Sequence, residues 1–539
     1  MPEPKRYKVE EIHQRYSHAK TKKDQWRSLY QQAYEYAIPN RSLYDGQHEG
    51  GTEGKSKMSK VFDSVAIHST QRFANRMQSG LFPPYKRWQK LEPGNEIPVE
   101  KRDAVQAALE VYTDRFFSTI QQSNFDLAMG EFLLDLSVGT AAMLVQRGEG
   151  LQPITFTTVP PYLIAIEEGT NGNVDNVYRD LRVRGEQIAR VWKDAELTDD
   201  LKEMIEDKPQ DEIEIIECTI ADVERGDYCY HVLVKNKQDR HDEIVYRRMK
   251  QSPWVVSRYS KIAGESFGRG PVLYALPDIK TLNKTVELLL KNGSLAVSGV
   301  YTATDDGILN PRTVKLTPGA IIPVARNGGP MGPSLLPLPR SGDINMSQLI
   351  IQNMQMSIKK MLLDDTLPPD NMTARSASEI VARQQELATN LGSAFGRLIT
   401  ETMVPIVTKT LALMDDAGLI DLPLKIDGLE VKVVPTGPLA MAQNIDDVDK
   451  AVQWLTLVSK LGPAGIASAR IDAIVDYIGD KLGVPQSLRT TAEERQGMMG
   501  DLQAAAAAGI GAPAIAGPAG GNQAVATPPD RGMQALMKS

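Results

Sequence analysis

The chain has 539 residues, of which 42% are apolar and 24% charged, with 6 histidines, 2 cysteines and a formal net charge of −7. This length exceeds what one compact core usually holds, so we expect two or more domains. No apolar run reaches the roughly 18 to 20 residues that span a bilayer, and the start of the chain is too polar for a secretory signal. The cysteines, Cys218 and Cys229, lack C-x-x-C spacing, which excludes a disulfide framework or a thiolate zinc site and predicts free thiols.

Charge is distributed unevenly along the chain. Residues 1–90 contain 17 basic and 9 acidic side chains, a net charge of +8, which leaves −15 for the remainder. A basic front can meet nucleic acid or an acidic partner, or it can be the solvated face of helices. Because tight, wrapped DNA binding needs many phosphate neutralisations, the acidic remainder predicts that any contact with DNA is loose.

Residues 1–139 predict a mainly helical region. Apolar residues at helical spacing, a glycine-rich loop and several prolines divide this region into separate helices. We expect helices at residues 8–37, 61–81, 99–120 and 125–138.

Residues 140–265 have a different pattern. Short runs rich in β-branched and aromatic residues predict strands, and an acidic stretch from about Gly185 to Asp207 predicts helix between them. The fold class expected for the chain is therefore α+β.

Two helices are expected to flank a strand-rich insert. The first would run over Pro277–Asn292, with Pro277 in its first turn and Gly293 as its C-terminal cap. The second would run over Ile344–Leu363. Residues 294–340 contain short β-type runs and a Pro/Gly-rich exit, so we expect a small β module at the end of a helical hairpin.

The last third of the chain is predicted to be helical again. After a Pro-rich stretch, a capping box at Ser376–Glu379 begins a helix of nearly 40 residues, to about Asp416, which Pro405 is expected to kink. Two helical segments follow between residues 446 and 482. Residues 501–539 form an alanine-rich, low-complexity tail that we predict to be disordered.

The stretch Gly264-Glu265-Ser266-Phe267-Gly268 matches the G-x-S-x-G pattern of a nucleophile elbow. In the fold that uses this elbow, the acid and the histidine follow the serine, whereas all six histidines here precede Ser266. A serine hydrolase that uses Ser266 is an alternative that no second motif supports. In the structural interpretation the glycines bend the chain.

Patterns for phosphate or metal binding are incomplete. Gly50–Ser56 resembles the end of a Walker A loop, but Glu49 stands where the first glycine is required, and no buried strand precedes it. The carboxylate pairs at 364–365 and 446–449 have no third ligand nearby in sequence, and they are otherwise interpreted as helix-end charges. We expect no catalytic residue, no metal and no cofactor.

The helix expected at Pro277–Asn292 separates apolar from basic residues. At about 100° per residue its apolar side chains share one face, while Lys280, Lys284 and Lys291 lie within about 40° of one another on another face. The stripe is either the solvated side of a hairpin or a wall past which a polyanion slides. The second helix carries a mostly neutral polar stripe, which consists of Gln348, Gln352, Gln355 and Lys359.

Three separated segments carry a resemblance to a known family. They are FANRMQSGLFPPYKRWQKL, GESFGRGPVLYALPDIKTLNKTVELLLKN and TARSASEIVARQQELATNLGSAFGRLITETMVPIV. In sequence and order they resemble the head-to-tail connector, or portal protein, of T7-like short-tailed bacteriophages (podoviruses), and the similarity extends over roughly residues 5–490. The remaining alternatives are an unrelated multi-domain scaffold and a motor NTPase that depends on Lys55.

The resemblance implies a homo-oligomeric ring, usually of twelve subunits, at one vertex of the capsid. Its implied partners are the terminase large subunit, tail and adaptor proteins, major capsid and scaffolding proteins, internal core proteins, and double-stranded DNA contacted without sequence specificity. No membrane partner is implied. The protein would reside in the virion at the portal vertex of the capsid, and in the host cytoplasm during assembly.

The resemblance also implies a division into portal domains. These are the wing at 1–265 (helical front 1–139, α+β part 140–265), stem helices at 266–293 and 341–363, the clip at 294–340, the tunnel loop at 364–377, the wing return at 378–438, the crown at 439–500 and the tail at 501–539.

Three sets of site residues follow from the resemblance. The DNA channel would be lined by Lys280, Lys284, Lys291, Gln348, Gln352 and Lys359. The tunnel loop would present Asp364, Asp365, Pro368, Pro369, Asn371, Thr373 and Arg375 to the DNA. Arg269 is a candidate contact to a neighbouring subunit.

Overall fold

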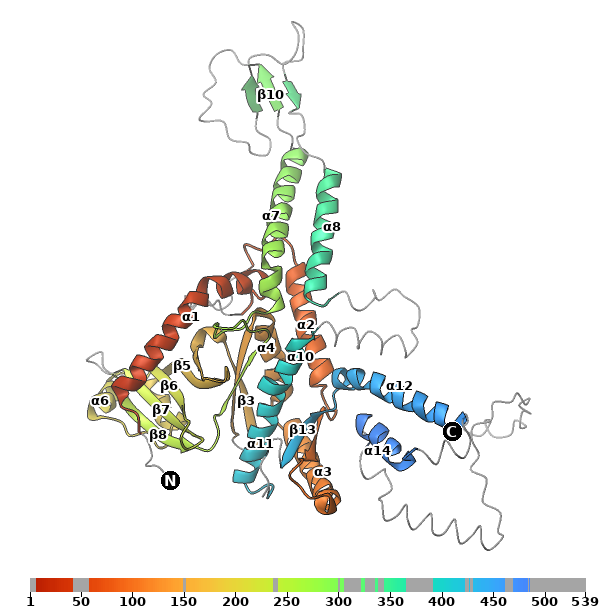
Figure 1. The fold of residues 1–539 in the computed structure, drawn as a ribbon. Coiled ribbons are helices and arrows are strands. Elements are labelled where there is room, and N and C mark those ends of the chain that lie inside the picture. Colours follow the sequence, from red (N-terminus) through yellow and green to blue (C-terminus); the bar gives the residue numbers. More distant parts are fainter. Residues whose placement is uncertain are drawn as a thin grey trace, which may run out of the picture. The chain divides into compact units, whose positions relative to one another are not determined.

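The computed structural model divides into two units, residues 1–482 and 483–539, and nearly all of the residues that it describes lie in the first (Figure 1). Among these residues, no helix combines the length and the hydrophobicity that a membrane span requires. The structure describes residues 6–41, 58–148, 152–235, 241–298, 301–304, 321–324, 335–337, 344–364, 391–421, 426, 430–460, 469–482 and 484.

Four helices form the front of the chain, as the sequence predicts. They are α1 (Val9–Ala37), α2 (Val65–Leu81), α3 (Val99–Gln121) and α4 (Phe125–Val138). α4 is buried over much of its surface, because Phe132, Leu133 and Leu136 lie in the largest apolar core. Trp88 packs in the same core, edge-on to Phe82 with ring centroids 5.0 Å apart.

The strands of the α+β part form two antiparallel sheets, which confirms the predicted change of pattern after residue 139. One sheet has the order β3-β2-β9, and the other is a meander in the order β4-β5-β6-β7-β8. The helices α5 (Gly185–Val191) and α6 (Asp199–Asp207) interrupt the meander where the acidic stretch predicts helix. The strands are β2 (Thr140–Arg147), β3 (Ile154–Val159), β4 (Ile164–Glu168), β5 (Val174–Arg184), β6 (Glu212–Asp222), β7 (Asp227–Lys235), β8 (His241–Met249) and β9 (Trp254–Arg258).

Cys218 and Cys229 lie in the middle of the meander, on β6 and β7. Both side chains are buried free thiols, as predicted. Cys218 is opposite His231 and Cys229 is opposite Ile220, so the two cysteines are not cross-strand partners. Burial raises the pKa of both thiols, which keeps them protonated and unreactive at neutral pH.

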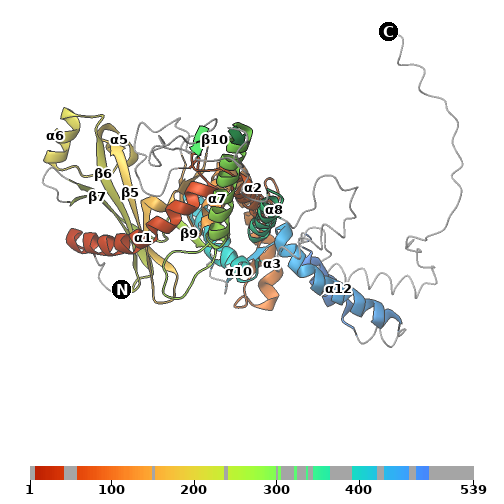
Figure 2. The ribbon, with the colours of Figure 1, turned by 90° about the horizontal axis from the view of Figure 1, so that it is seen from above.

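Two helices form the predicted hairpin, α7 (Pro271–Ser298) and α8 (Ile344–Met361). They run side by side in Figure 1, and Figure 2 views the same pair from above. Between them in sequence, three short strands pair in the order β11-β10-β12, which confirms a small β module. These strands are β10 (Tyr301–Thr304), β11 (Ile321–Val324) and β12 (Leu335–Pro337).

The first helix of the hairpin is longer than predicted at both ends. It begins at Pro271, with Pro277 inside it, and it continues past Gly293, which therefore is not a C-terminal cap. Proline suits the first helical position because the missing N–H has no intrahelical partner there. Gly270, just before the helix, hydrogen-bonds through its N–H to the carbonyl of Val138 at 2.7 Å, and this contact fixes the start.

The prediction of one continuous helix from Ser376 to Asp416 is wrong. Residues 365–390 are outside the described part, and the chain turns at Gly392, whose φ of +47° favours glycine. α10 (Ser393–Leu398), a π-helical turn (Ile399–Met403) and α11 (Val404–Asp416) follow. Pro405 directly follows the π-helical turn, so the helical run from Ser393 to Asp416 is irregular next to the proline that was expected to kink it.

The chain then returns to the front of the molecule. β13 (Val431–Pro435) pairs antiparallel with β1 (Gln89–Pro93), so that Gln89 lies opposite Pro435. The two helical segments predicted between residues 446 and 482 are present as α12 (Pro438–Lys460), which begins earlier than predicted, and α14 (Ile471–Lys481). The predicted tail at 501–539 lies outside the described residues.

Candidate functional site

The hairpin leaves the body at a junction in which glycine backbones pack directly against each other. The hydroxyl of Tyr30 donates to the carbonyl of Gly268 at 2.5 Å, and the N–H of Gly268 donates to Oγ1 of Thr140 at 2.8 Å. A Cβ added to Gly268 would lie 2.5 Å from the carbonyl oxygen of Gly139. The glycines of this stretch therefore allow two backbone segments to approach each other closely.

Ser266 lies in this junction and is partly exposed. Among the described residues, no histidine forms a hydrogen bond with Ser266, and Phe267 beside it is fully buried against Trp26 and Tyr30. The neighbouring Glu265 pairs with Arg269. The geometry of the stretch is that of a packed turn, not of an activated nucleophile.

Arg269 has partners within its own subunit. Its guanidinium makes two hydrogen bonds to Glu265, at 2.9 and 2.6 Å, and stacks 4.9 Å from the ring centre of Trp26. The hydrogen bonds from Arg269 lower the pKa of Glu265, so this carboxylate stays charged. A contact from Arg269 to a neighbouring subunit stays a prediction.

The base of the hairpin is tied to the segment just before α2. Asn283 of α7 donates to the carbonyl of Lys60 at 2.7 Å and accepts the N–H of Phe62 at 2.6 Å. Gln355 of α8 donates to the carboxylate of Asp63 at 2.8 Å. One residue of the predicted polar stripe, Gln355, thus binds the body, and both helices are fixed by the same short segment.

The predicted apolar face of α7 is only partly buried. Ile279 and Leu282 are buried in the same apolar cluster as Ile358 of α8 and Leu362, which directly follows this helix. Leu290, which the helical pattern places on the packing face, is 58% exposed. Further along the hairpin other large apolar side chains are also exposed, namely Leu288, Leu349 and Met356.

The three lysines of the predicted stripe are all exposed, but they are not free of partners. Lys280 donates to Oε1 of Gln32 at 3.0 Å, and Lys284 and Lys291 both pair with Glu287, at 3.0 and 2.5 Å. Their hydrogen bonds lower the pKa of Glu287. The stripe therefore combines three positive charges with one negative charge. The two ion pairs of Glu287 could have been predicted from the sequence, because Glu287 stands three residues after Lys284 and four residues before Lys291.

On α8, the remaining polar residues predicted for the channel are Gln348, Gln352 and Lys359. All three side chains are exposed. The predicted polar stripes are thus weakly positive along α7 and mostly neutral along α8, and exposed apolar side chains lie on the same two helices.

Asp364, predicted as the first residue of a loop, is buried at the end of α8. Its carboxylate accepts a hydrogen bond from Ser69 at 2.8 Å and pairs with Arg72 at 3.4 Å and Arg76 at 3.5 Å. Arg76 also donates to the carbonyls of Leu363 and Asp364. This set, Ser69, Arg72, Arg76 and Asp364, is called the α2–α8 clamp below.

The backbone at the clamp has the geometry of a helix C-terminus. Leu363 has a φ of +57°, and the N–H of Asp364 returns to the carbonyl of Lys359 at 2.7 Å. A left-handed leucine carries a conformational cost of about 1 kcal/mol, which the contacts of Arg76 to its carbonyl offset. The clamp thus fixes where the chain leaves α8.

The other predicted loop and phosphate-binding residues cannot be placed. Lys55 and the residues Asp365, Pro368, Pro369, Asn371, Thr373 and Arg375 lie outside the described part. Within the described part, no group of three or more His, Cys, Asp or Glu side chains is arranged to hold a metal ion. Asp364 is instead neutralised by arginines.

Comparison with known proteins identifies the family. The chain belongs to the family described as "Bacteriophage head to tail connecting protein", which matches residues 9–489. This confirms the resemblance predicted from the three sequence segments. It also confirms the prediction of a structural protein rather than an enzyme.

Named relatives cover most of the chain. The portal protein of Enterobacteria phage T3 is 22% identical over 504 residues, which are 90% of this chain and 89% of that protein. The portal protein of Escherichia phage T7 is 22% identical over 528 residues, or 93% and 94% of the two chains. A solved chain from the virion of a native gene transfer agent particle is 13% identical, with a TM-score of 0.33 over 79% of this chain and 92% of that one. This score is too low to carry an argument.

Proposed function

We propose that this chain is a portal subunit that assembles into a closed ring, of twelve copies, at one vertex of a phage head. The observation that carries the proposal is the family match over residues 9–489. The exposed apolar side chains of the hairpin support it. Leu288, Leu290 and Leu349 are each more than half exposed in the isolated subunit, and neighbouring copies would bury them.

In this ring the hairpin would form the wall of the DNA channel. The 28 residues of α7 and the 18 of α8 give lengths of about 42 and 27 Å at 1.5 Å per residue. Lys280, Lys284 and Lys291 would meet phosphates, while Glu287 between two of them lowers the attraction. Weak, sequence-independent attraction suits a duplex that must slide, because each neutralised phosphate adds to the affinity.

The remaining parts would serve the predicted portal domains. The wing would comprise residues 1–265 and 378–438, the stem 266–293 and 341–363, the clip 294–340, the tunnel loop 364–377 and the crown 439–500. The terminase large subunit and later the tail and adaptor proteins would dock at the clip. Capsid, scaffolding and internal core proteins would contact the other domains in the virion.

Negative-stain images of the purified chain test the ring. We expect particles with a central hole and about a dozen subunits, and small compact particles would refute the proposal. A Leu290→Glu chain should fail to form rings, because it places charge in the buried contact between stems. Leu127→Glu is the matched control, since Leu127 is 78% exposed on α4, away from the hairpin.

The channel wall is tested by a triple variant, Lys280→Ala, Lys284→Ala and Lys291→Ala. Rings should still form, since these side chains are exposed, and the amount of DNA in assembled particles should fall. A matched control replaces three exposed lysines elsewhere, Lys202, Lys208 and Lys250, by alanine. Equal amounts of packaged DNA in both variants and the wild type would contradict the assignment of α7 to the channel.

A further inference from the structure

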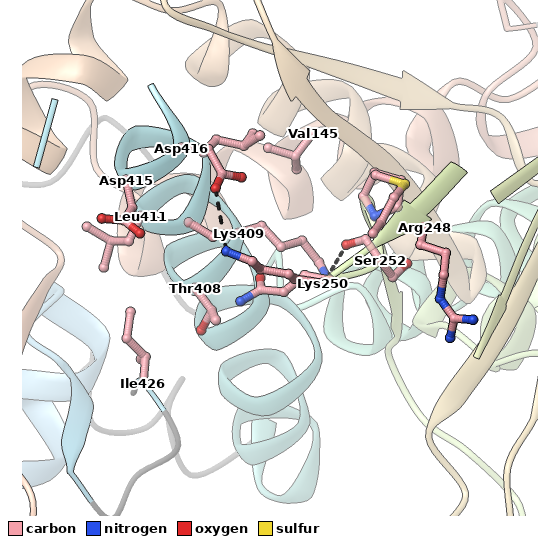
Figure 3. Close-up of a pocket in the computed structure, with 15 residues that line it drawn as sticks. Val145, Arg248, Lys250, Ser252, Thr408, Lys409, Leu411, Asp415, Asp416 and Ile426 are labelled. Atoms are coloured by element: carbon pink, nitrogen blue, oxygen red, sulfur yellow. Dashed lines mark hydrogen bonds and ion pairs between the residues drawn. The ribbon is translucent and has the colours of Figure 1, made fainter. Parts of the chain in front are cut away.

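A cavity opens between α11 and the turn that joins β8 to β9 (Figure 3). Its volume is about 610 Å³, within the range of roughly 300 to 1,000 Å³ that is usual for small-molecule sites. Much of its lining is apolar and comes from Val145, Met249, Pro253, Leu411, Leu413 and Ile426. The cavity is far from the hairpin in sequence, and the function proposed above assigns it no role.

One cation in the cavity has no anionic partner among the described residues. Lys409 of α11 donates to the carbonyl of Ser252 at 2.6 Å, which uses one of the three N–H groups of its ammonium (Figure 3). A carbonyl carries no net charge, so this bond leaves the charge of Lys409 uncompensated.

The other charged groups of the lining are already paired. Arg248 binds Asp222 at 2.7 Å and Asp227 at 2.5 Å. Lys250 lies 4.0 Å from Asp416, and both side chains are exposed. Among the described lining residues, Lys409 is therefore the cation that could receive an anion without losing an ion pair.

The burial of this ammonium has an energetic consequence. Burial lowers the pKa of Lys409 to about 8, and no acidic neighbour opposes the shift. At pH 7 the group is still mostly charged, although it has lost much of its hydration. An anion that enters the cavity would replace the hydration that the ammonium has lost, since a buried charge is costly unless it is paired.

We propose that this cavity binds a small amphiphilic carboxylate, whose carboxylate pairs with Lys409 while its apolar part contacts Val145, Leu411 and Ile426. One lysine suits a single negative charge. The carboxylates of Asp415 and Asp416 are also part of the lining, and they disfavour ligands with two or more negative charges. This binding does not depend on the ring or on its DNA channel.

Isothermal titration of the purified full-length chain with octanoate at pH 7 tests the proposal, with octanamide as the uncharged analogue. We expect octanoate to bind and octanamide to bind at least tenfold more weakly. Lys409→Met should lower the affinity for octanoate at least tenfold, because the methionine keeps the apolar stem and removes the charge. Lys208→Met, at an exposed lysine outside the cavity lining, should leave the affinity unchanged.

A second variant covers the case in which Lys409→Met does not fold. Ala412→Phe keeps the lysine and fills part of the cavity, so it should also abolish binding of octanoate. Binding by the wild type should also weaken at least tenfold from pH 7 to pH 9.5, as the ammonium loses its proton. No detectable binding of octanoate, equal affinity for octanamide, or unchanged affinity in Lys409→Met or in Ala412→Phe would each overturn the proposal.

Discussion

We expect that replacement of the part-buried Lys409 by methionine stabilises the fold at neutral pH, because the ammonium is desolvated. Burial lowers the pKa of this group from 10.5 to about 8. At about 1.4 kcal/mol per pKa unit, the charged form below pH 8 costs the folded state about 3 kcal/mol. Lys409→Met removes this cost and loses one hydrogen bond, to Ser252, worth about 1 kcal/mol. The variant should therefore be about 2 kcal/mol more stable than the wild type at pH 7.

The advantage of Lys409→Met must also depend on pH in a fixed direction. Between pH 8 and 10.5 the folded wild type binds fewer protons than the unfolded chain, so its stability rises with pH. The full cost is present below pH 8 and disappears as the pH approaches 10.5. From pH 7 to pH 9.5 the difference between variant and wild type should shrink by about 2 kcal/mol.

Urea denaturation followed by tryptophan fluorescence measures this difference, because Trp254 is buried two residues from Ser252. The protein concentration must be kept fixed, since assembly also adds to the apparent stability. Lys250→Met is the control and should change stability by less than about 0.5 kcal/mol at either pH, because Lys250 is 91% exposed. A Lys409→Met chain less stable than the wild type at pH 7, or a difference that does not change with pH, would refute the reasoning.

Three further substitutions test the junction, α7 and the α2–α8 clamp by thermal denaturation. Gly268→Ala should destabilise by about 1 to 3 kcal/mol because its Cβ meets the Gly139 carbonyl at 2.5 Å, and an unchanged melting temperature would exclude this close approach. Gly293→Ala should raise the free energy of unfolding by about 0.5 to 1 kcal/mol, because Gly293 is inside α7 with open space around it. A loss of stability would instead support the predicted role of Gly293 as a C-terminal cap. Asp364→Ala should lower the free energy of unfolding by about 3 kcal/mol, because it removes the carboxylate that pairs with Arg76. An unchanged stability would show that the clamp is solvated.

The sequence was a good guide to the helices and to the α+β class. Apolar spacing is a local signal, and α4 has the predicted bounds because its apolar residues keep helical spacing from Phe125 to Val138, directly before Gly139. The start of α7 was mistaken because Pro271 and Pro277 both suit a first turn. The choice between them is made by the bond from Gly270 to Val138, more than one hundred residues away in sequence.

The candidate site was predicted less completely than the fold. The exposed lysines of α7 could be placed from their spacing, and Glu287 could have been included for the same reason. The α2–α8 clamp could not be predicted, because Arg76 and Asp364 are 288 residues apart and only the folded chain brings them together. The role of Lys409 as a desolvated cation could not be predicted either, because it depends on burial in the folded chain.

The contacts of the hairpin indicate which part of the chain sets its position. Asn283 binds the backbone of residues 60–62, Gln355 binds Asp63, and the end of α8 is held by Arg76 of α2. All three ties lie between residues 60 and 76. A tilt of the hairpin therefore has to carry this segment with it or break these part-buried polar contacts, each of which contributes about 1 kcal/mol. It follows that α2 and the residues just before it, and not the packed glycine junction alone, determine the angle at which each subunit would present its stem to the channel.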